Sequence, residues 1–441
     1  MARHTEQDRR YDAFLETKPA TPLSQVSERL TLVAVLHVAA ENSPMVKVAY
    51  HKWQAAGQKY PQAFTLPDPT IEAKYYIRQM APEEAKWELM VSQAIPYPGK
   101  LVIAGKIADK DAQTAYLRYQ ATVRNALTET KEMYFELYYI DRAKNITGEI
   151  KNLYERYAAL GAGGTEVANP KLPEQFRAES QKTQLSYDLI LLDEMREAEC
   201  ARLRAMLGMN SIHLIGPTED VAEPADMRES LENLQEIAER YNQELAAAGV
   251  EVERSQLQTK YARRAPIPDL MVSGSYMRTG EMRDGADPSR NPITVGVGIS
   301  VPIWFNKYSA MAREAKEMEH AAIAEEEGQR QQVRSNLAKA YFSLRNASRL
   351  VRLYRDTLIP QARQALQSAE ELYRNGQANL ASVLETTATI HNFQLARLRA
   401  MTDYYQNVAR VERVLGTAFE PAPAGKREVP LKHELPTEKK E

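Results

Sequence analysis

The chain contains a single cysteine and no long hydrophobic run. One cysteine can form neither an intramolecular disulfide nor a thiolate metal cluster, so both are excluded. The longest apolar stretch, Leu32 to Ala40, is interrupted by His37 and is far shorter than the ~20 residues of a membrane-spanning helix. A helical membrane protein is therefore excluded. A membrane β-barrel is not excluded, because alternating strands leave little trace in average hydropathy.

The chain also lacks an excess of charge of either sign. Its 57 Lys and Arg residues face 59 Asp and Glu residues, so the formal net charge is −2 over 441 residues. A protein that attracts nucleic acid by bulk positive charge is therefore not expected. Residues 1–25 contain no apolar core of a signal peptide. Two interpretations stay open: a cytosolic protein, or a chain whose signal was trimmed or whose start was misplaced.

Short motifs recur in the two halves of the chain, about 200 residues apart. The matched pairs are Asn42 and Asn242, Pro67-Asp68 and Pro268-Asp269, Ile95-Pro96 and Val301-Pro302, Tyr134–Leu137 and Tyr341–Leu344, and Leu207-Gly208 and Leu415-Gly416. Because the spacing drifts by only a few residues over all pairs, we predict two tandem copies of one unit.

Each copy is predicted to contain a very long helical hairpin. From Val333 to Tyr354 apolar residues recur at steps of three and four, which is typical of a coiled-coil seam. The helical pattern extends from Ser309 to Arg374 and is broken only by Pro360, which should kink the helix. At 1.5 Å per residue the rod would be about 100 Å long. Helices of this length indicate a bundle, a fibre or a tube.

Between the helices lie four segments in which apolar and polar residues alternate. The alternation is strict in Thr294–Ile303 and weaker in Leu270–Met277, and it predicts strands with one apolar and one polar face. A soluble hairpin packed on a small core is one interpretation. Segments of about 10–12 residues are also long enough to cross a bilayer at a tilt. Four strands cannot close a barrel, so several chains would have to pool them, and three would supply twelve.

The order and spacing of these motifs resemble the TolC-type outer-membrane efflux family over about residues 28–416. The matching stretches are Asn42-Ser43-Pro44, Pro67-Asp68-Pro69, Ser92 to Lys100, Val301 to Trp304, and Tyr373 to Gly376 followed by Val383 to Thr386. The stretch from Ser92 to Lys100 is similar to the branch that serves heavy-metal cation exporters. The resemblance implies a homotrimer in which twelve strands form one outer-membrane β-barrel. Twelve helices would continue it as a periplasmic α-barrel, closed at its far end by the helix tips.

We therefore predict a mainly α chain with a small β part. A polar segment, 1–27, precedes repeat 1 (28–210), which has strands at about 68–79 and 86–97 and a helical hairpin at about 104–208. A linker, 211–226, leads to repeat 2 (227–416), which has strands at about 269–280 and 292–304 and a helical hairpin at about 308–416. Residues 417–441 are rich in Pro, Lys and Glu and should form a flexible tail.

The resemblance also implies a gate at the helix tips. Ser382 and Glu385 match the positions of the family's constriction, and only Glu385 is acidic. In a trimer it would place three carboxylates around the axis. The alternative is an ordinary solvated glutamate on a helix face. Glu174 and Glu179, near the first tip, are weaker candidates.

Two further sets of residues follow from the resemblance. Adaptor contacts are expected at the tips, at Asn375 and Gly376 and, in the first tip, at Gly163 and Gly164. The first tip lacks the family's Tyr-Arg-x-Gly motif. Aromatic residues at strand ends suit a membrane–water girdle, with a hydrophobic plug as the alternative. The girdle candidates are Trp87, Tyr97, Trp304 and Phe305.

Metal, cofactor and catalytic sites are not predicted. The seven histidines show no metal-ligand spacing, and the Gly161–Gly164 stretch lacks the Lys-Ser/Thr ending of a phosphate loop. Met271, Met277 and Met282 could meet soft ions, but lipid-facing or loop-facing positions are the better expectation. Cys200 is expected to be a buried small hydrophobe. The sequence shows no set of nucleophile, base and electrophile.

The prediction is a passive exit duct of a tripartite efflux system, located in the outer membrane with a periplasmic extension. It would conduct substrates such as heavy-metal cations or drugs. Its partners would be two further copies, a periplasmic adaptor (membrane fusion protein), an inner-membrane pump and outer-membrane lipid. The alternative is a soluble coiled-coil scaffold or a periplasmic membrane-fusion adaptor. An adaptor should have one helical hairpin between lipoyl-like β halves, whereas this sequence shows two hairpins.

Overall fold

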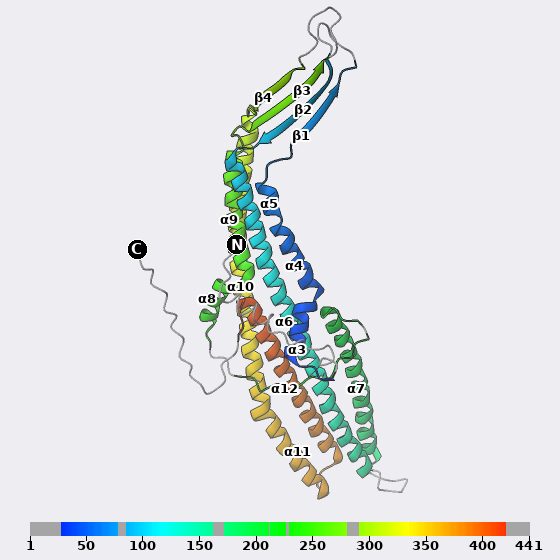
Figure 1. Ribbon diagram of the computed structural model, residues 1–441. Helices are drawn as coiled ribbons and strands as arrows, with labels where there is room; N and C mark the ends of the chain where they lie inside the picture. The colour runs from blue at the N-terminus through cyan, green and yellow to red at the C-terminus, as the bar shows by residue number, and fades with distance from the viewer. Residues whose placement is uncertain are drawn as a thin grey trace, which may run out of the picture. The chain divides into compact units, whose positions relative to one another are not determined.

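The computed structural model describes residues 28–77, 85–161, 172–210, 212–225, 229–279 and 291–419. Gly163, Gly164, Met282, the polar segment 1–27 and most of the predicted tail lie outside these ranges. The described residues are mainly helical, with one small sheet (Figure 1). Among them, no helix combines the length and the apolar character needed to cross a membrane.

The elements follow one another in two runs along the chain. The first run is α3 (Leu32–Asn42), α4 (Pro44–Gly57), α5 (Lys59–Phe64), β1 (Thr70–Tyr75), β2 (Ala85–Ile95), α6 (Pro98–Gly161) and α7 (Leu172–Met206). The second run is α8 (Leu231–Tyr241), α9 (Gln243–Arg264), β3 (Leu270–Thr279), β4 (Ile293–Ile299), α10 (Phe305–Leu353), the π-helical turn η1 (Tyr354–Leu358), α11 (Ile359–Arg374) and α12 (Leu380–Leu415). Both runs place two strands between shorter helices and a long one.

The elements form two compact units that are interleaved in the sequence. The helical unit comprises Met1–Lys47, Val123–Asn242 and Val333–Glu441, and the sheet unit comprises Val48–Thr122 and Gln243–Gln332. Each unit therefore takes segments from both halves of the chain. The helices α6 and α10 contribute residues to both units.

The helical unit packs a conventional apolar core. Leu337 and Leu344 of α10 are fully buried and cluster with Val411 and Val414 of α12. They belong to the series of three- and four-residue steps that begins at Val333, so the predicted seam is the face of α10 that packs on α12. A second cluster joins α6, α7, α11 and α12 around Tyr154.

Two glycines end helices of the helical unit in the same way. Gly208 follows α7 with φ +62°, and Gly416 follows α12 with φ +75°. A Cβ atom at Gly208 would lie 3.0 Å from the Asn42 carbonyl oxygen, and one at Gly416 would lie 2.1 Å from the Tyr241 carbonyl oxygen. Both positions therefore require glycine for the left-handed backbone and for close approach to a neighbouring helix end.

The kink predicted at Pro360 takes the form of a π-helical turn. Proline provides no amide hydrogen for the carbonyl four residues earlier, at Asp356. The helix widens immediately before it, where the Ile359 amide donates to the Tyr354 carbonyl, five residues back. The long second rod is thereby divided into α10 and α11.

The sheet unit holds one antiparallel sheet of four strands in the order β1-β2-β3-β4. The central pairing joins β2 of the first half to β3 of the second, from Ala85↔Thr279 to Ile95↔Leu270. β4 ends at Ile299, earlier than the alternation through Ile303 predicts. Pro302 cannot donate a ladder hydrogen bond, which explains why pairing stops ahead of it.

Candidate functional site

The sheet has two chemically distinct faces. Across all three pairings, residues that stand opposite each other share a face. One face carries Ile71, Ala73, Tyr75, Trp87, Leu89, Val91, Ile95, Leu270, Val272, Tyr276, Ile293, Val295, Val297 and Ile299, with Gln93 and Arg278 near its ends. The other carries Thr70, Glu72, Lys74, Glu88, Met90, Ser92, Met271, Ser273, Ser275, Met277 and Thr294, with glycines on β4. We call these the apolar face and the polar face.

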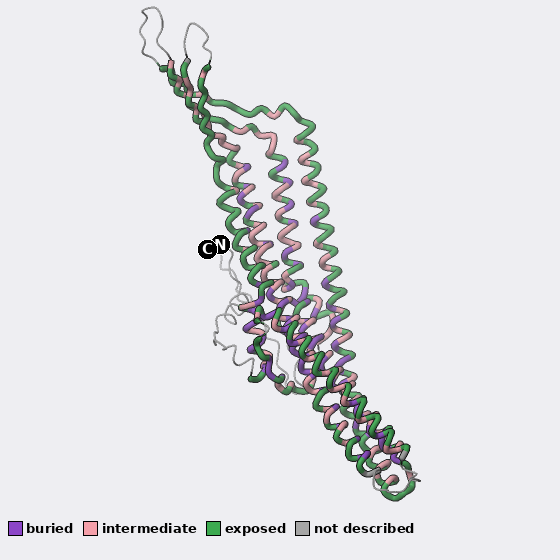
Figure 2. Tube along the Cα trace, turned by 90° about the vertical axis from the view of Figure 1, so that its right-hand side faces the viewer, coloured by how far each residue is buried: buried purple, intermediate pink, exposed green. Residues whose placement is uncertain are grey.

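The apolar face is the more exposed of the two. The side chains of Val295 and Val297 are 77% and 72% exposed, whereas Ser273 and Ser275 on the polar face are half-buried. In Figure 2 most of the sheet is drawn as exposed. This is the reverse of a sheet that packs its apolar side on a core, and an apolar patch of this size marks an interaction surface. Among the described residues, the outer edges of β1 and β4 have no strand partner.

Aromatic side chains gather at both ends of the apolar face. At the helix-proximal end, Tyr97 follows β2, and Trp304 and Phe305 lead into α10; all three are exposed. At the other end Trp87 stands opposite Tyr75, and its ring centre lies 5.5 Å from that of Tyr276. Sequence reasoning selected Trp87 but missed Tyr75 and Tyr276, because only the register shows that they join it.

A partly buried ion pair fixes the junction between sheet and helix. Lys100, in the first turn of α6, donates from Nζ to Asp269 Oδ1 at 2.9 Å and to the Ile267 carbonyl at 2.7 Å. The Tyr97 amide donates to the same Asp269 oxygen at 2.9 Å. Lys100 is only 8% exposed. Since the pair connects the start of α6 with the start of β3, it ties the two halves of the chain together.

The strand register assigns two of the three methionines to one face of the sheet. Met271 and Met277 lie on the polar face with Met90, and Met277 stands opposite Glu88. The apolar–polar alternation of β3 is weak in the sequence because these methionines occupy positions of the polar face. Among the described residues, no group of three or more His, Cys, Asp and Glu side chains is placed to hold a metal ion. Cys200 is buried in α7, and this burial raises the pKa of its thiol.

The second helix tip is a tight turn between α11 and α12. Asn375 caps α11, and Gly376 has φ +71° with open space for 4 Å around the point that a Cβ would occupy. The Gln377 amide donates to the Leu372 carbonyl at 2.8 Å, so backbone bonds close the turn. Both Asn375 and Gly376 are exposed, as an adaptor contact requires.

The predicted gate residues lie in the first turns of α12. Ser382 donates from its amide and hydroxyl to the side chain of Asn379, the N-cap residue. Glu385 is exposed, and its carboxylate has no hydrogen-bond or ion-pair partner among the described residues. Of the weaker candidates, Glu174 accepts the Leu380 amide, and Glu179 pairs with Lys182 at 2.6 Å. Glu385 is thus the tip carboxylate that remains available.

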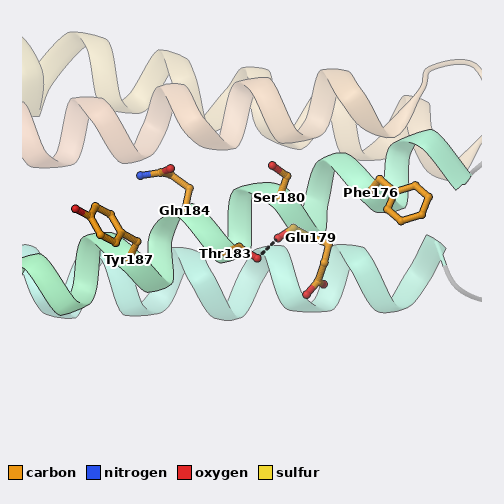
Figure 3. A pocket seen from close by; sticks show the side chains of 6 residues that line it. All are labelled: Phe176, Glu179, Ser180, Thr183, Gln184 and Tyr187. Carbon is orange, nitrogen blue, oxygen red and sulfur yellow. Dashed lines mark hydrogen bonds between the residues drawn. The ribbon is translucent and has the colours of Figure 1, made fainter.

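A shallow groove runs along the outer face of α7 (Figure 3). Its lining residues project from one side of the helix: Phe176, Glu179, Ser180, Thr183, Gln184 and Tyr187. Phe176 and Tyr187 are 66% and 61% exposed, and Ile190 extends the apolar stripe. Of these residues the sequence analysis singled out only Glu179, as a weaker gate candidate. In an isolated chain this face leaves large apolar side chains in water.

Several known proteins are similar to this chain in sequence or in fold. Residues 234–417 match the model of the family described as outer membrane efflux protein. The cobalt-zinc-cadmium resistance protein CzcC of Cupriavidus metallidurans is 24% identical over 400 residues, which cover 88% of this chain and 90% of CzcC. The solved outer-membrane channel OprN has a TM-score of 0.74 at 18% identity, covering 88% of this chain and 90% of OprN. The outer membrane protein VceC from Vibrio cholerae has a TM-score of 0.73 at 17% identity, covering 88% of this chain and 97% of VceC.

The fold is that of solved outer-membrane channels such as OprN, and residues 234–417 carry the sequence pattern of outer membrane efflux proteins. The resemblance predicted from the sequence is confirmed, because the second half of the chain matches the family model and CzcC is similar along most of the chain. The alternative of a scaffold or a membrane-fusion adaptor is therefore set aside.

Proposed function

We propose that three copies of this chain form one exit duct, in which twelve strands close a barrel across the outer membrane. The exposed apolar face of the sheet is the observation that carries this proposal. Lipid would cover that face, and the polar face would line the lumen. Membrane barrels alternate apolar-out and polar-in residues in the same way.

The strand order supports closure by three copies. The strands alternate in direction across the sheet, so β4 of one copy would meet β1 of the next in an antiparallel pair. No strand edge would then remain open in hydrocarbon, as the bilayer requires. Twelve strands also exceed the roughly eight needed for a barrel to enclose an interior.

The aromatic residues support the same placement. Trp87 and Tyr97 lie at opposite ends of the apolar face, and their separation corresponds to about 33 Å of extended strand. At a tilt of about 40° the height is about 25 Å, which matches the apolar band of outer-membrane barrels. Tyr97, Trp304 and Phe305 would form one girdle, and Tyr75, Trp87 and Tyr276 the other.

Two faces of the helical unit support a tunnel built from neighbouring copies. In Figure 1 α6 and α12 lie between α7 and α11, which leaves an outer face on each. On α7, Glu194 follows Tyr187 and Ile190. The opposite face belongs to α10, which continues through η1 into α11. There Arg345 and Arg349 lie among the exposed side chains of Phe342 and Leu353. Opposite charges within apolar surroundings suit a contact between the α7 face of one copy and the α10 face of the next.

The tips would form the constriction and the adaptor contact. Three copies of Glu385, with Ser382 one turn away, would surround the axis and attract cations. Asn375 and Gly376 would meet the periplasmic adaptor, and the inner-membrane pump would supply the energy. The relative CzcC is named for cobalt, zinc and cadmium resistance, so heavy-metal cations are the substrates that we propose first, and drugs second.

Fractionation of cells that express the full-length chain tests the assembly. We expect a heat-sensitive trimer in the outer-membrane fraction, which runs as a trimer unboiled and as a monomer after boiling. A soluble monomer or an elongated dimer would overturn the proposal.

Planar-bilayer conductance tests the gate. Glu385→Gln should reduce block of the open channel by divalent cations, because it removes three carboxylates from the constriction. Glu371→Gln, an exposed helix-face glutamate on α11, is the matched control and should leave block unchanged. Equal block in wild type and in Glu385→Gln would remove Glu385 from the constriction.

A further inference from the structure

A segment without regular secondary structure, residues 215–225, crosses the helical unit between α7 and α8. We call it the strap. Its first part is anchored to α6 and α7. Arg196 Nη2 donates to the Gly216 carbonyl at 2.9 Å, and Thr218 donates from its amide and its hydroxyl to Asp141 Oδ2, both at 2.9 Å. Arg196 and Asp141 also pair with each other at 2.8 Å, with side chains only 19% and 12% exposed.

The second part of the strap lies on α12. The Tyr404 hydroxyl donates to the Ala225 carbonyl at 2.9 Å, and the Tyr405 hydroxyl donates to the Ala222 carbonyl at 2.5 Å. Val221 packs against two apolar clusters, one with Leu398 and the other with Val351. The strap thus contacts α6, α7, α10 and α12 within eleven residues.

Glu223 extends this contact to the π-helical turn. Its carboxylate pairs with Arg397 of α12 and, at 3.6 Å, with Arg355 of η1. Arg355 lies in η1, where the regular helical backbone hydrogen bonding between α10 and α11 is interrupted ahead of Pro360. Interruptions of this kind concentrate bending at one place in a helix. Glu223 therefore holds the point about which α11 can move relative to α10.

The ion pairs at the two ends of the strap differ in solvent exposure. The Arg196–Asp141 anchor is nearly buried, whereas Glu223 and Arg355 are 47% and 39% exposed. Ion pairs that remain solvated are weak and easily exchanged. The strap backbone is accordingly held on both sides, and the Glu223–Arg355 pair is the contact that can be released.

We propose that Glu223 is a gating residue: its pairing with Arg355 holds the π-helical turn in the present conformation, and its release lets α11 and the α11–α12 tip move. This inference rests on the proposed function, because it takes that tip as the constriction. A switch between two helix arrangements, biased by one local contact, is an established form of conformational control.

The test compares Glu223→Gln with Asp220→Asn in the full-length protein. Both remove one carboxylate charge from the strap, but Asp220 pairs with Arg142 of α6, away from the π-helical turn. Backbone amide hydrogen exchange in 354–374 and planar-bilayer conductance are both measured. In Glu223→Gln we expect exchange in 354–374 and mean conductance to rise by about two- to fivefold, the effect of losing one partly exposed ion pair. In Asp220→Asn we expect neither to change.

Equal effects of the two substitutions, or none from Glu223→Gln, would overturn the inference. Arg355→Gln breaks the same pair from the other side, but it also removes the pair of Arg355 with Asp356 at 2.7 Å. The combined effect of Glu223→Gln and Arg355→Gln should therefore be smaller than the sum of the two single effects. If Glu223→Gln fails to fold, Arg355→Gln alone tests the role of the Glu223–Arg355 pair. A wild-type chain that never conducts would instead contradict the proposed function, and the exchange measurement would still decide the role of Glu223.

Discussion

The helical unit and the sheet place apolar side chains in opposite environments. In the helical unit Leu337 and Leu344 are fully buried, whereas on the sheet Val295 and Val297 are more than 70% exposed. Both sets come from strictly periodic stretches of the same half of the chain. The period determines which face is apolar, but it does not determine what covers that face.

The described residues of one chain bury the apolar side chains of the helical unit but not those of the sheet. The core of the helical unit is completed by residues of the same chain, so its stability belongs to the protomer. The apolar face of the sheet is covered by nothing among the described residues, and in the proposed assembly lipid would cover it. The same substitution should therefore have different consequences in the two places.

Truncation of a core leucine should have the largest effect. Leu344→Ala removes a fully buried side chain and should lower the free energy of unfolding by about 2–5 kcal/mol. Val297→Ala, on the apolar face of the sheet, should change it by less than about 0.5 kcal/mol in detergent, since no protein cavity forms. Urea unfolding followed by circular dichroism at 222 nm measures both. Similar losses in the two variants would mean that the apolar face packs on protein.

Introduction of a charge should distinguish the two faces of the sheet. Val297→Arg places a guanidinium on the proposed lipid side and should cost about 2–4 kcal/mol per copy near the bilayer midplane. Thr294→Arg, on the polar face of the same strand, should insert normally. The yield of heat-sensitive trimer in the outer-membrane fraction reports the difference. If Thr294→Arg lost the trimer and Val297→Arg kept it, the assignment of the two faces would have to be exchanged.

Periodicity predicted the elements because it depends only on neighbours in the sequence. The strict alternation in Thr294–Ile303 placed β4, and the three- and four-residue steps from Val333 placed the seam of α10. Pro360 predicted a kink for the same local reason. Whether that kink would be a bend or a π-helical turn depends on how the neighbouring carbonyls find partners, which the sequence does not specify.

Features that depend on pairing between distant segments were not predictable. The contact of β2 with β3 joins residues more than 170 positions apart, and it alone brings Tyr276 beside Trp87. The strap is a similar case, because Arg196 and Asp141 meet through the packing of α6 on α7. Among the gate candidates, Glu385 came from the family motif, and its unpaired carboxylate was seen only in the structure.

A buried histidine should make the helical unit sensitive to acid. His391 of α12 is 9% exposed, and its Nε2 lies 3.2 Å from the Thr147 hydroxyl of α6. Burial lowers the pKa of His391 below its ordinary value, although the negative charge of Asp188 on α7 acts in the opposite direction. The unfolded chain therefore binds a proton more readily than the folded one. Stability should be complete above about pH 6.5 and should fall as the pH decreases below it.

The urea midpoint measured between pH 7 and pH 5 checks this prediction, with His391→Gln as the control. Glutamine can still hydrogen-bond to Thr147 but does not titrate, so its midpoint should vary less over this range. His51 and His320 of the sheet unit are present in both proteins, so a difference between the two pH profiles comes from position 391. Parallel pH profiles of the urea midpoint would show that His391 does not contribute to the acid sensitivity of the helical unit.

The smallest effects should come from two uncrowded glycines of the helical unit that differ in backbone conformation. Gly376, at the tip, has φ +71°, whereas Gly148 lies within α6; neither has an atom near a Cβ position. Gly376→Ala should destabilise the tip by about 1 kcal/mol, because alanine is strained in the left-handed region. Gly148→Ala should stabilise α6 by about 0.5–1 kcal/mol, since alanine favours the helix. Urea midpoints that shift in the same direction would show that the turn at Gly376 can adopt another conformation, which would weaken its assignment as a preformed adaptor contact.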